Sequence, residues 1–199
     1  MNFPHEIESN LLSIFPYLRK EDLEQFYQIS DLKSYSAKEC ILISGVTSRK
    51  AFYIVKGVVR GYLIDQNGQE RDLILRAEGV FTGDPDALLS SHPQTLTFQA
   101  LTQVNILLFS FEEFEALAYK NKNILTMYLD ILKENLIISR NRLNDMILLS
   151  KEEYYTKLLQ NNPIFLEKAQ KKYVANYLGI TPESLSRLIK RIEIKNKLT

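Results

Sequence analysis

The sequence predicts an α+β protein with an N-terminal β jelly roll, a long helix and a C-terminal pair of short helices. Three observations support this prediction. Short β-rich segments separated by turn residues run from Tyr35 to Phe109, and a long segment without Gly or Pro follows them. Near the end of the chain, two amphipathic helical patterns flank a single Gly. We therefore expect three parts, at residues 1–121, 122–149 and 150–199.

The composition limits the classes to which the chain can belong. Of its 199 residues, 45% are hydrophobic and only seven are Gly and six Pro, which is typical of a globular protein. The start lacks the pattern of a secretory signal, and no apolar segment approaches the roughly 20 residues of a membrane span, so a cytoplasmic protein is expected. Cys40 is the only cysteine and His5 and His92 the only histidines. We therefore expect no disulfide, no iron–sulfur cluster, no metal site and no cofactor.

The N-terminal part begins with helical patterns and continues with strands. Apolar residues at helical spacing, with a break at Pro16, predict two short helices within residues 7–32. Strands are then expected at Cys40–Ile43, Ala51–Val55, Val58–Ile64, Arg71–Leu75, Val80–Thr82, Leu96–Leu101 and Val104–Phe109. Asn67-Gly68 predicts a hairpin between two of them, because both residues accept positive φ. Many short strands at this spacing are typical of a jelly roll.

The segment Lys122–Leu149 predicts one long helix, preceded by a helical segment at Phe111–Ala118. Positions at alternating spacings of four and three form a heptad seam: Leu125, Leu129, Leu132, Leu136, Ser139, Leu143 and Met146. Such a seam packs against a second helix, and the helix would be about 40 Å long, more than a small domain needs for cover. A long core helix inside a monomer is the alternative. We favour a homodimer held by the apolar residues of this seam, with Tyr128, Ile131 and Ile138 facing the jelly roll.

The end of the chain predicts a helix-turn-helix. After a helix at Ser150–Asn161, a short helix at Lys171–Leu178 ends at Gly179, which can take positive φ. Thr181 can cap the next helix, and Pro182 suits its first position. Apolar residues at helical spacing then pack the second helix on the first: Leu185, Leu188, Ile189 and Ile192.

The charge of this end favours DNA as its partner. Eight Lys or Arg and two Glu give residues 168–199 a net charge of +6, whereas the whole chain carries +1. A concentrated basic end is typical of phosphate binding, because affinity for nucleic acid comes largely from the release of counterions. An ordinary helical hairpin with a solvated basic face is the alternative interpretation. We favour binding to double-stranded DNA.

Jelly roll, long helix and helix-turn-helix, in this order, resemble the Crp/Fnr family of transcription regulators. The most specific element is Leu178-Gly179-Ile180-Thr181-Pro182-Glu183-Ser184-Leu185-Ser186-Arg187, which is similar to the recognition-helix pattern of that family. The resemblance implies a homodimer on an inverted-repeat operator and, for an activator, contact with RNA polymerase. It implies base reading by Glu183, Ser186 and Arg187, which is chemically sensible because Glu accepts from cytosine and Arg donates to guanine. It also implies phosphate contacts from the flanking polar residues Gln170, Lys171, Lys172, Thr181 and Lys190.

The resemblance also points to an effector pocket with altered chemistry. Members that bind cyclic nucleotides carry Gly-Glu and, ten residues after the Glu, an Arg followed by a small residue. Here Gly83-Asp84 and Gln94-Thr95 stand at that spacing. Gln94 is neutral, and a buried phosphate without a paired cation is costly. The resemblance therefore implies another small-molecule effector or none, and the alternative is that these are ordinary loop residues.

A metal-dependent enzyme and a protein-regulating module are the two alternatives to a DNA-binding regulator. Jelly rolls also hold metal-dependent enzymes, but those draw several His and carboxylates from the barrel, and the barrel here has only His92. We therefore expect no catalytic residues. The second alternative is a cyclic-nucleotide-like module that regulates a partner protein, and the basic helix-turn-helix argues against it.

Overall fold

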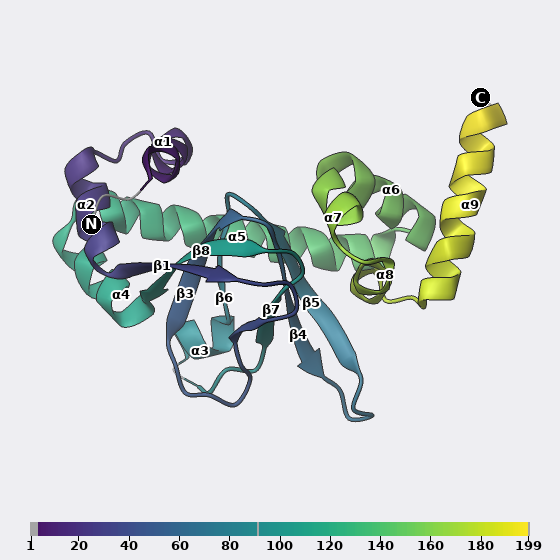
Figure 1. Ribbon diagram of the computed structural model, residues 1–199, viewed down its shortest axis with the longest axis horizontal. Coiled ribbons are helices and arrows are strands. Elements are labelled where there is room, and N and C mark those ends of the chain that lie inside the picture. Colours follow the sequence, from purple (N-terminus) through teal and green to yellow (C-terminus); the bar gives the residue numbers. More distant parts are fainter. Residues whose placement is uncertain (1–3, 91, 199) are drawn as a thin grey trace.

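Two antiparallel sheets form the body of the N-terminal part, in the computed structural model, which describes residues 4–90 and 92–198 (Figure 1). One sheet has the strand order β1-β8-β3-β6 and the other β2-β7-β4-β5. The strands are β1 (Ser30–Tyr35), β2 (Cys40–Leu42), β3 (Lys50–Lys56), β4 (Val58–Ile64), β5 (Glu70–Ala77), β6 (Phe81–Gly83), β7 (Thr97–Ala100) and β8 (Val104–Ser110). The predicted jelly roll is confirmed.

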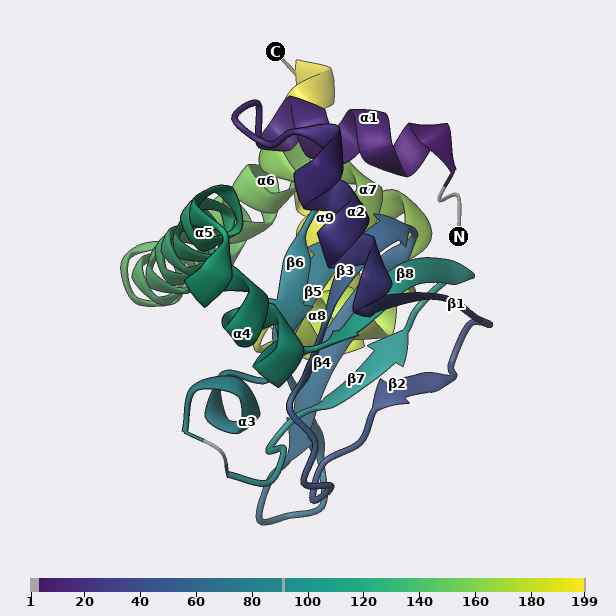
Figure 2. The ribbon, with the colours of Figure 1, turned by 90° about the vertical axis from the view of Figure 1, so that its left-hand side faces the viewer.

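Helices lie at both ends of the sandwich and along its length. They are α1 (His5–Ile14), α2 (Lys20–Gln28), α3 (Pro85–Leu89), α4 (Phe111–Lys120), α5 (Lys122–Leu148), α6 (Lys151–Asn161), α7 (Pro163–Lys168), α8 (Lys171–Leu178) and α9 (Pro182–Leu198). Figure 1 shows α5 running the length of the sandwich, with α1 and α2 at one end and α6 to α9 at the other. Figure 2 looks along α5 and shows α3, α4 and α5 on one side of the sheets.

Two apolar cores hold the N-terminal part together. Between the sheets, Phe52 and Phe98 are fully buried and meet edge to face, with ring centroids 5.4 Å apart. Outside the first sheet, an aromatic cluster joins α2 and α4 to the strands. Phe26 packs edge-on against Phe109 at 5.2 Å and Phe114 at 5.8 Å. Such aromatic pairs stabilise the fold beyond the area that they bury. Ile124 and Met127, at the start of α5, belong to the same apolar cluster.

The structure corrects several sequence-based boundaries. The helices predicted within residues 7–32 end at Gln28, and β1 starts at Ser30, where no strand was predicted. Two short helices, α3 and α7, were missed as well. The hairpin at Asn67-Gly68 is confirmed as the β4–β5 connection, but only Gly68 has positive φ, at 74°. The Gly68 N–H donates to the Asp65 carbonyl at 2.9 Å, and the Asp65 N–H donates to the Gln69 carbonyl at 2.8 Å, which closes the turn.

Candidate functional sites

The C-terminal helices form the predicted helix-turn-helix. Gly179 ends α8 in the left-handed region, with φ 70° and ψ 35°, and its N–H donates to the Ala175 and Asn176 carbonyls. At the start of α9, the Thr181 hydroxyl accepts from the Ser184 N–H at 3.2 Å and so caps the helix. Leu185 and Leu188 are buried against α8 and the helices before it. Local signals therefore set this motif, as the sequence predicted.

The opposite face of α9 is open to solvent and carries the three residues expected to read bases. Glu183 and Arg187 are exposed, one helical turn apart. Hydrogen bonds from its own backbone N–H and from Thr181, together with the nearby Arg187, lower the pKa of Glu183, which favours an ionised acceptor. The Ser186 hydroxyl donates to the Pro182 carbonyl at 2.9 Å, within the helix. The arrangement exposes a carboxylate and a guanidinium on one face of α9, where they can meet base edges by exchanging contacts within the helix.

The residues expected to contact phosphates are exposed on α8 and α9. Gln170 is the N-cap residue of α8, and Lys171 and Lys172 occupy its first turn, all three exposed. The Lys172 ammonium lies 4.6 Å from the centre of the Tyr173 ring. Lys190 is exposed on α9. Exposed cations around a solvent-facing helix are the arrangement that phosphate binding requires.

The heptad seam of α5 changes its environment along the helix. Leu125 packs on the aromatic core at the N-terminal end, and Leu132 is half-buried. Leu136 is 71% exposed and Leu143 57% exposed, and they continue the seam toward the C-terminal helices. Further apolar side chains are exposed on the same helix: Leu129, Ile137, Met146, Ile147 and Leu148. A long exposed apolar face of this kind is typical of a protein interface.

The four residues expected in the effector pocket come together, but as part of the protein's own framework. Asp84 is 1% exposed and caps α3 by accepting from the Asp86 N–H at 3.0 Å. It also accepts from the backbone N–H groups of Thr95 at 2.5 Å and Leu96 at 2.8 Å. Gln94 is buried, and its amide donates to the Ser48 carbonyl at 3.0 Å. The carboxylate thus joins two segments of the loop, and its oxygens already have donors.

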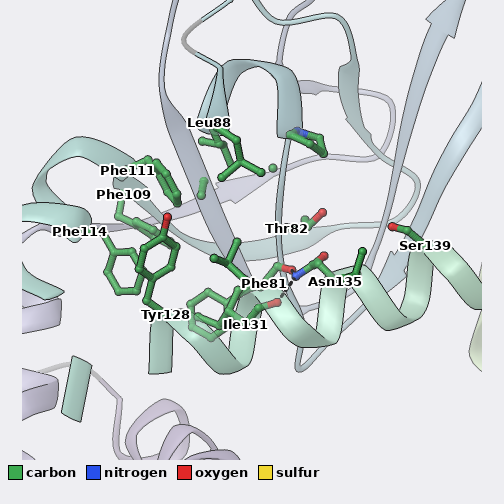
Figure 3. Close-up of a pocket in the computed structure, with 16 residues that line it drawn as sticks. Phe81, Thr82, Leu88, Phe109, Phe111, Phe114, Tyr128, Ile131, Asn135 and Ser139 are labelled. Atoms are coloured by element: carbon green, nitrogen blue, oxygen red, sulfur yellow. Dashed lines mark hydrogen bonds between the residues drawn. The ribbon is translucent and has the colours of Figure 1, made fainter. Parts of the chain in front are cut away.

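An apolar cavity of about 250 Å³ lies beside these residues, between α3, α4, α5 and the first sheet (Figure 3). Gly83 borders it, and a Cβ at this position would lie 2.7 Å from Leu88. Aromatic and aliphatic side chains form most of its wall, as Figure 3 shows for Phe81, Phe109, Phe111, Phe114, Tyr128 and Ile131. Asn135 of α5 borders it too, with its amide donating to the Phe81 and Ile131 carbonyls. No charged side chain lines the cavity within the described part of the chain.

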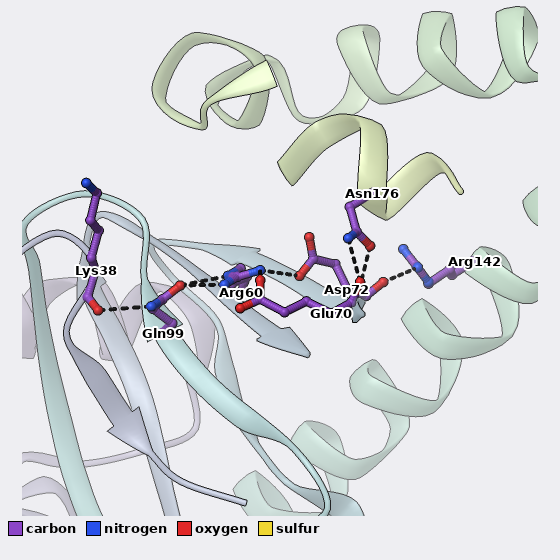
Figure 4. Close-up of polar contacts among 7 residues, drawn as sticks. All are labelled: Lys38, Arg60, Glu70, Asp72, Gln99, Arg142 and Asn176. Carbon is purple, nitrogen blue, oxygen red and sulfur yellow. Dashed lines mark hydrogen bonds and ion pairs between the residues drawn. The ribbon is translucent and has the colours of Figure 1, made fainter. Parts of the chain in front are cut away.

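A buried polar network, which no sequence pattern predicted, lies between the second sheet and the C-terminal helices (Figure 4). Its centre is Arg60 of β4, 2% exposed, which pairs with Asp72 at 3.0 Å and Glu70 at 2.6 Å. Its Nε and Nη2 atoms donate to the side-chain oxygen of Gln99 at 2.9 and 2.7 Å. Burial disfavours the guanidinium charge, but the two carboxylates outweigh this effect and raise the pKa of Arg60. The network therefore keeps a buried positive charge beside α8.

Removing one side of this ion pair should destabilise the protein strongly. Asp72 is almost fully buried, so Asp72→Ala removes the buried carboxylate and leaves the Arg60 charge with only the partly exposed Glu70 as its carboxylate partner. We expect a loss of about 3–5 kcal/mol in the free energy of unfolding, measured by urea titration. Asp31→Ala is the control, because Asp31 forms an exposed pair with Lys33 and should change stability by about 1 kcal/mol or less. Equal losses of unfolding free energy in the two variants would show that the buried ion pair contributes no more to stability than the exposed pair.

A metal-binding cluster and a membrane-spanning helix are both absent from the part of the chain that the structure describes. Within those residues, no group of three or more His, Cys, Asp or Glu side chains could hold a metal ion. In the same ranges, no helix is both long enough and apolar enough to cross a membrane. Cys40 is exposed on β2 as a free thiol. The helix-turn-helix, the α5 face and the cavity are therefore the candidate sites.

Known proteins with similar sequences are transcriptional regulators. Residues 32–121 match the family model for the cyclic nucleotide-binding domain. The cAMP-activated global transcriptional regulator CRP of Salmonella typhimurium is 21% identical over 187 residues, which cover 89% of each chain. The anaerobic regulatory protein of Haemophilus influenzae is 23% identical over 195 residues, covering 88% of this chain and 72% of that protein. The similarity therefore extends well beyond the jelly roll.

Solved structures share the architecture. The c-di-GMP responsive global regulator CLP of Xanthomonas campestris superposes with a TM-score of 0.71 at 16% identity, covering 89% of this chain and 93% of that one. The sensor domain of the transcriptional regulator DNR from Pseudomonas aeruginosa superposes with a TM-score of 0.59 at 21% identity. That likeness covers 75% of this chain and 99% of the other. At these identities the likeness shows a common fold.

Proposed function

We propose that the chain is a transcriptional regulator of the Crp/Fnr type that binds an inverted-repeat DNA operator as a homodimer, because residues 32–121 match the cyclic nucleotide-binding domain and the similar known proteins are transcriptional regulators. Residues 1–121 are the sensor domain, 122–149 the dimerisation helix and 150–199 the DNA-binding domain. The observation that carries the proposal is the solvent-facing side of α9, where Glu183 and Arg187 lie one turn apart among exposed cations. An activator of this kind would also contact RNA polymerase.

The apolar face of α5 supports the dimer in this proposal. Leu136 and Leu143 lie on the heptad seam and are more than half exposed in the single chain. Two copies of α5 packed in parallel along this seam would bury both leucines. The two helix-turn-helix motifs would then lie at the same end of the dimer. A two-fold symmetric pair of reading helices matches an operator of two inverted half-sites.

Selection of bound sequences from random duplex DNA tests the proposed function. We expect an enriched inverted repeat whose half-site centres lie about one helical turn, or about 10–10.5 base pairs, apart. Each half-site should contain a specified G·C pair, read by Arg187 and Glu183. Retention of DNA should fall steeply with salt. Failure to enrich any sequence, together with salt-independent retention, would contradict the proposal and favour a module that acts on a protein.

For the sensor, we propose that cyclic AMP is not the effector and that the cavity suits an uncharged, apolar ligand. Asp84 is 1% exposed and accepts from three backbone N–H groups and from the Thr95 hydroxyl, so its oxygens are not available to a ribose hydroxyl. Gln94 has no charge, and no charged side chain lines the cavity in the described part of the chain. Transfer of a phosphate into such a site without a paired cation is unfavourable.

Titration calorimetry with cyclic AMP checks this proposal. We expect no saturable heat, which corresponds to a dissociation constant weaker than about 1 mM, or about −4 kcal/mol. Cyclic GMP should behave in the same way, because it carries the same phosphate. Micromolar binding of cyclic AMP that persists in Asp84→Ala and Gln94→Ala would mean that the phosphate is held elsewhere.

A further inference from the structure

Asn176 of α8 joins the helix-turn-helix to β5 of the sensor through two hydrogen bonds. Its side-chain oxygen accepts from the Asp72 N–H at 2.8 Å, and its amide nitrogen donates to the Glu70 carbonyl at 2.7 Å (Figure 4). Both strand groups belong to the backbone. The amide therefore fixes the position and the angle of α8 against the strand, because two bonds in one plane allow little rotation.

Two arginines strengthen the same contact from either side. Arg142 of α5 donates to the Asp72 carbonyl at 2.8 Å and to the Tyr177 carbonyl at 3.2 Å, and its guanidinium lies 3.5 Å from the centre of the Tyr177 ring. Arg60 of β4 lies 4.3 Å from the centre of the Tyr173 ring. Cation–π contacts of this kind gain strength where water is excluded. We call these residues the junction: Arg60, Asp72, Arg142, Tyr173, Asn176 and Tyr177.

The junction ties the DNA-binding helices to two elements at once, the sensor sheet and the long helix. Arg142 is the shared member, since it starts from α5 and reaches both β5 and the end of α8. Val58 and Leu75 of the sheet pack in the same apolar core as α6, α7 and α8. The link between α5 and α6 is short, because α5 ends at Leu148 and α6 begins at Lys151. It therefore allows little rotation of the C-terminal helices relative to α5. The orientation of α9 relative to α5 is therefore set by these contacts.

From this geometry we infer that the junction sets the spacing between half-sites, with Asn176 and Arg142 as positioning residues that do not contact DNA. The inference rests on the proposed function, in which paired α5 helices define the two-fold axis. The angle that the junction imposes between α9 and α5 then fixes the distance and rotation between the two reading helices. A dimer with loosened junctions can turn its reading helices to reach half-sites at other spacings.

The test compares operators that differ only in the number of base pairs between the half-sites. Inserting one base pair rotates one half-site by about 34° relative to the other. For the wild-type dimer, insertion or deletion of one base pair should lower affinity by about 100-fold, because the two half-sites can no longer be bound simultaneously. For Asn176→Ala, the same change should cost about tenfold or less. Arg142→Gln should relax the spacing in the same direction.

Asn141→Ala is the matched control, since Asn141 is exposed on α5 next to Arg142. It should retain the wild-type dependence on spacing. Affinity for a duplex with one half-site reports a folded reading helix, and it should be unchanged in every variant. Unchanged spacing dependence in both Asn176→Ala and Arg142→Gln, with normal single half-site binding, would overturn the inference. Loss of single half-site binding in both variants would also overturn it, because the junction would then serve folding alone. Absence of wild-type DNA binding would instead refute the proposed function.

Discussion

Leu136→Glu should convert the dimer to monomers and lower affinity for the full operator by about 10²–10⁴-fold. Leu136 is 71% exposed in the single chain and lies in the middle of the heptad seam, so a dimer would bury two copies of the new carboxylate without a partner. The affinity falls because each half-site is then bound separately and the gain from linked binding disappears. Sedimentation at micromolar concentration measures the first effect, and titration of labelled operator measures the second.

Two further variants separate the dimer seam from other roles of this region. Leu136 also borders the cavity, whereas Leu143 does not, and Leu143→Glu should give the same result. Leu32→Glu changes an exposed leucine of β1 and should leave the dimer intact. A wild-type protein that sediments as a monomer at micromolar concentration would refute the assembly, as would a Leu136→Glu variant that remains dimeric.

Arg187→Ala should cost about 1–3 kcal/mol per half-site, or about 2–6 kcal/mol for the dimer, and should relax the preference at one base pair. Its side chain is exposed, and its guanidinium donates to the Ser184 hydroxyl of the same helix at 3.3 Å. That neutral hydrogen bond is weak beside a bidentate contact with guanine. Binding to a panel of operators, each with one base pair changed, measures both the weaker affinity and the altered preference.

Lys171→Ala provides the contrast that identifies base reading. A phosphate contact carries no sequence information, so this variant should weaken all operators alike. It should also flatten the slope of log affinity against log salt by about 0.9 for each phosphate that the protein no longer neutralises. A merely basic surface would respond in the same way to both substitutions. If Arg187→Ala left the order of preference among operators unchanged, α9 would not be the reading helix.

Elements with strong local signals were predicted well from the sequence. Gly179 with its left-handed conformation and Thr181 as a cap define the turn between α8 and α9, and both act within a few residues. The uninterrupted heptad pattern predicted α5 to within one residue of its end. The pattern of apolar and polar residues and the capping residues suffice in such cases, because the interactions that form the element join residues close in the sequence.

Elements that depend on distant partners were missed. Five of the six residues of β1 are not buried, so no alternating pattern marks it, and its pairing with β8 makes it a strand. Helix α3 is only five residues long, and Asp84 caps its N-terminus. Asp84 was assigned to the effector because spacing shows where a carboxylate stands but not which donors surround it. The sequence did not predict the junction for the same reason. Asn176 and Asp72 form a hydrogen bond in the folded chain although they are 104 residues apart in the sequence.

The two hydrogen bonds of Asn176 also protect the sensor from self-association. In the order β2-β7-β4-β5, β5 is an edge strand, and an open edge offers its N–H and C=O groups to strands of other molecules. Asn176 occupies two of these groups, and α7 and α8 pack against the same strand. The C-terminal helices α7 and α8 thus cover the edge of the sheet. A fragment that ended before α6 would lack this cover and expose Leu75 and Val58, and we expect it to aggregate by strand addition along β5.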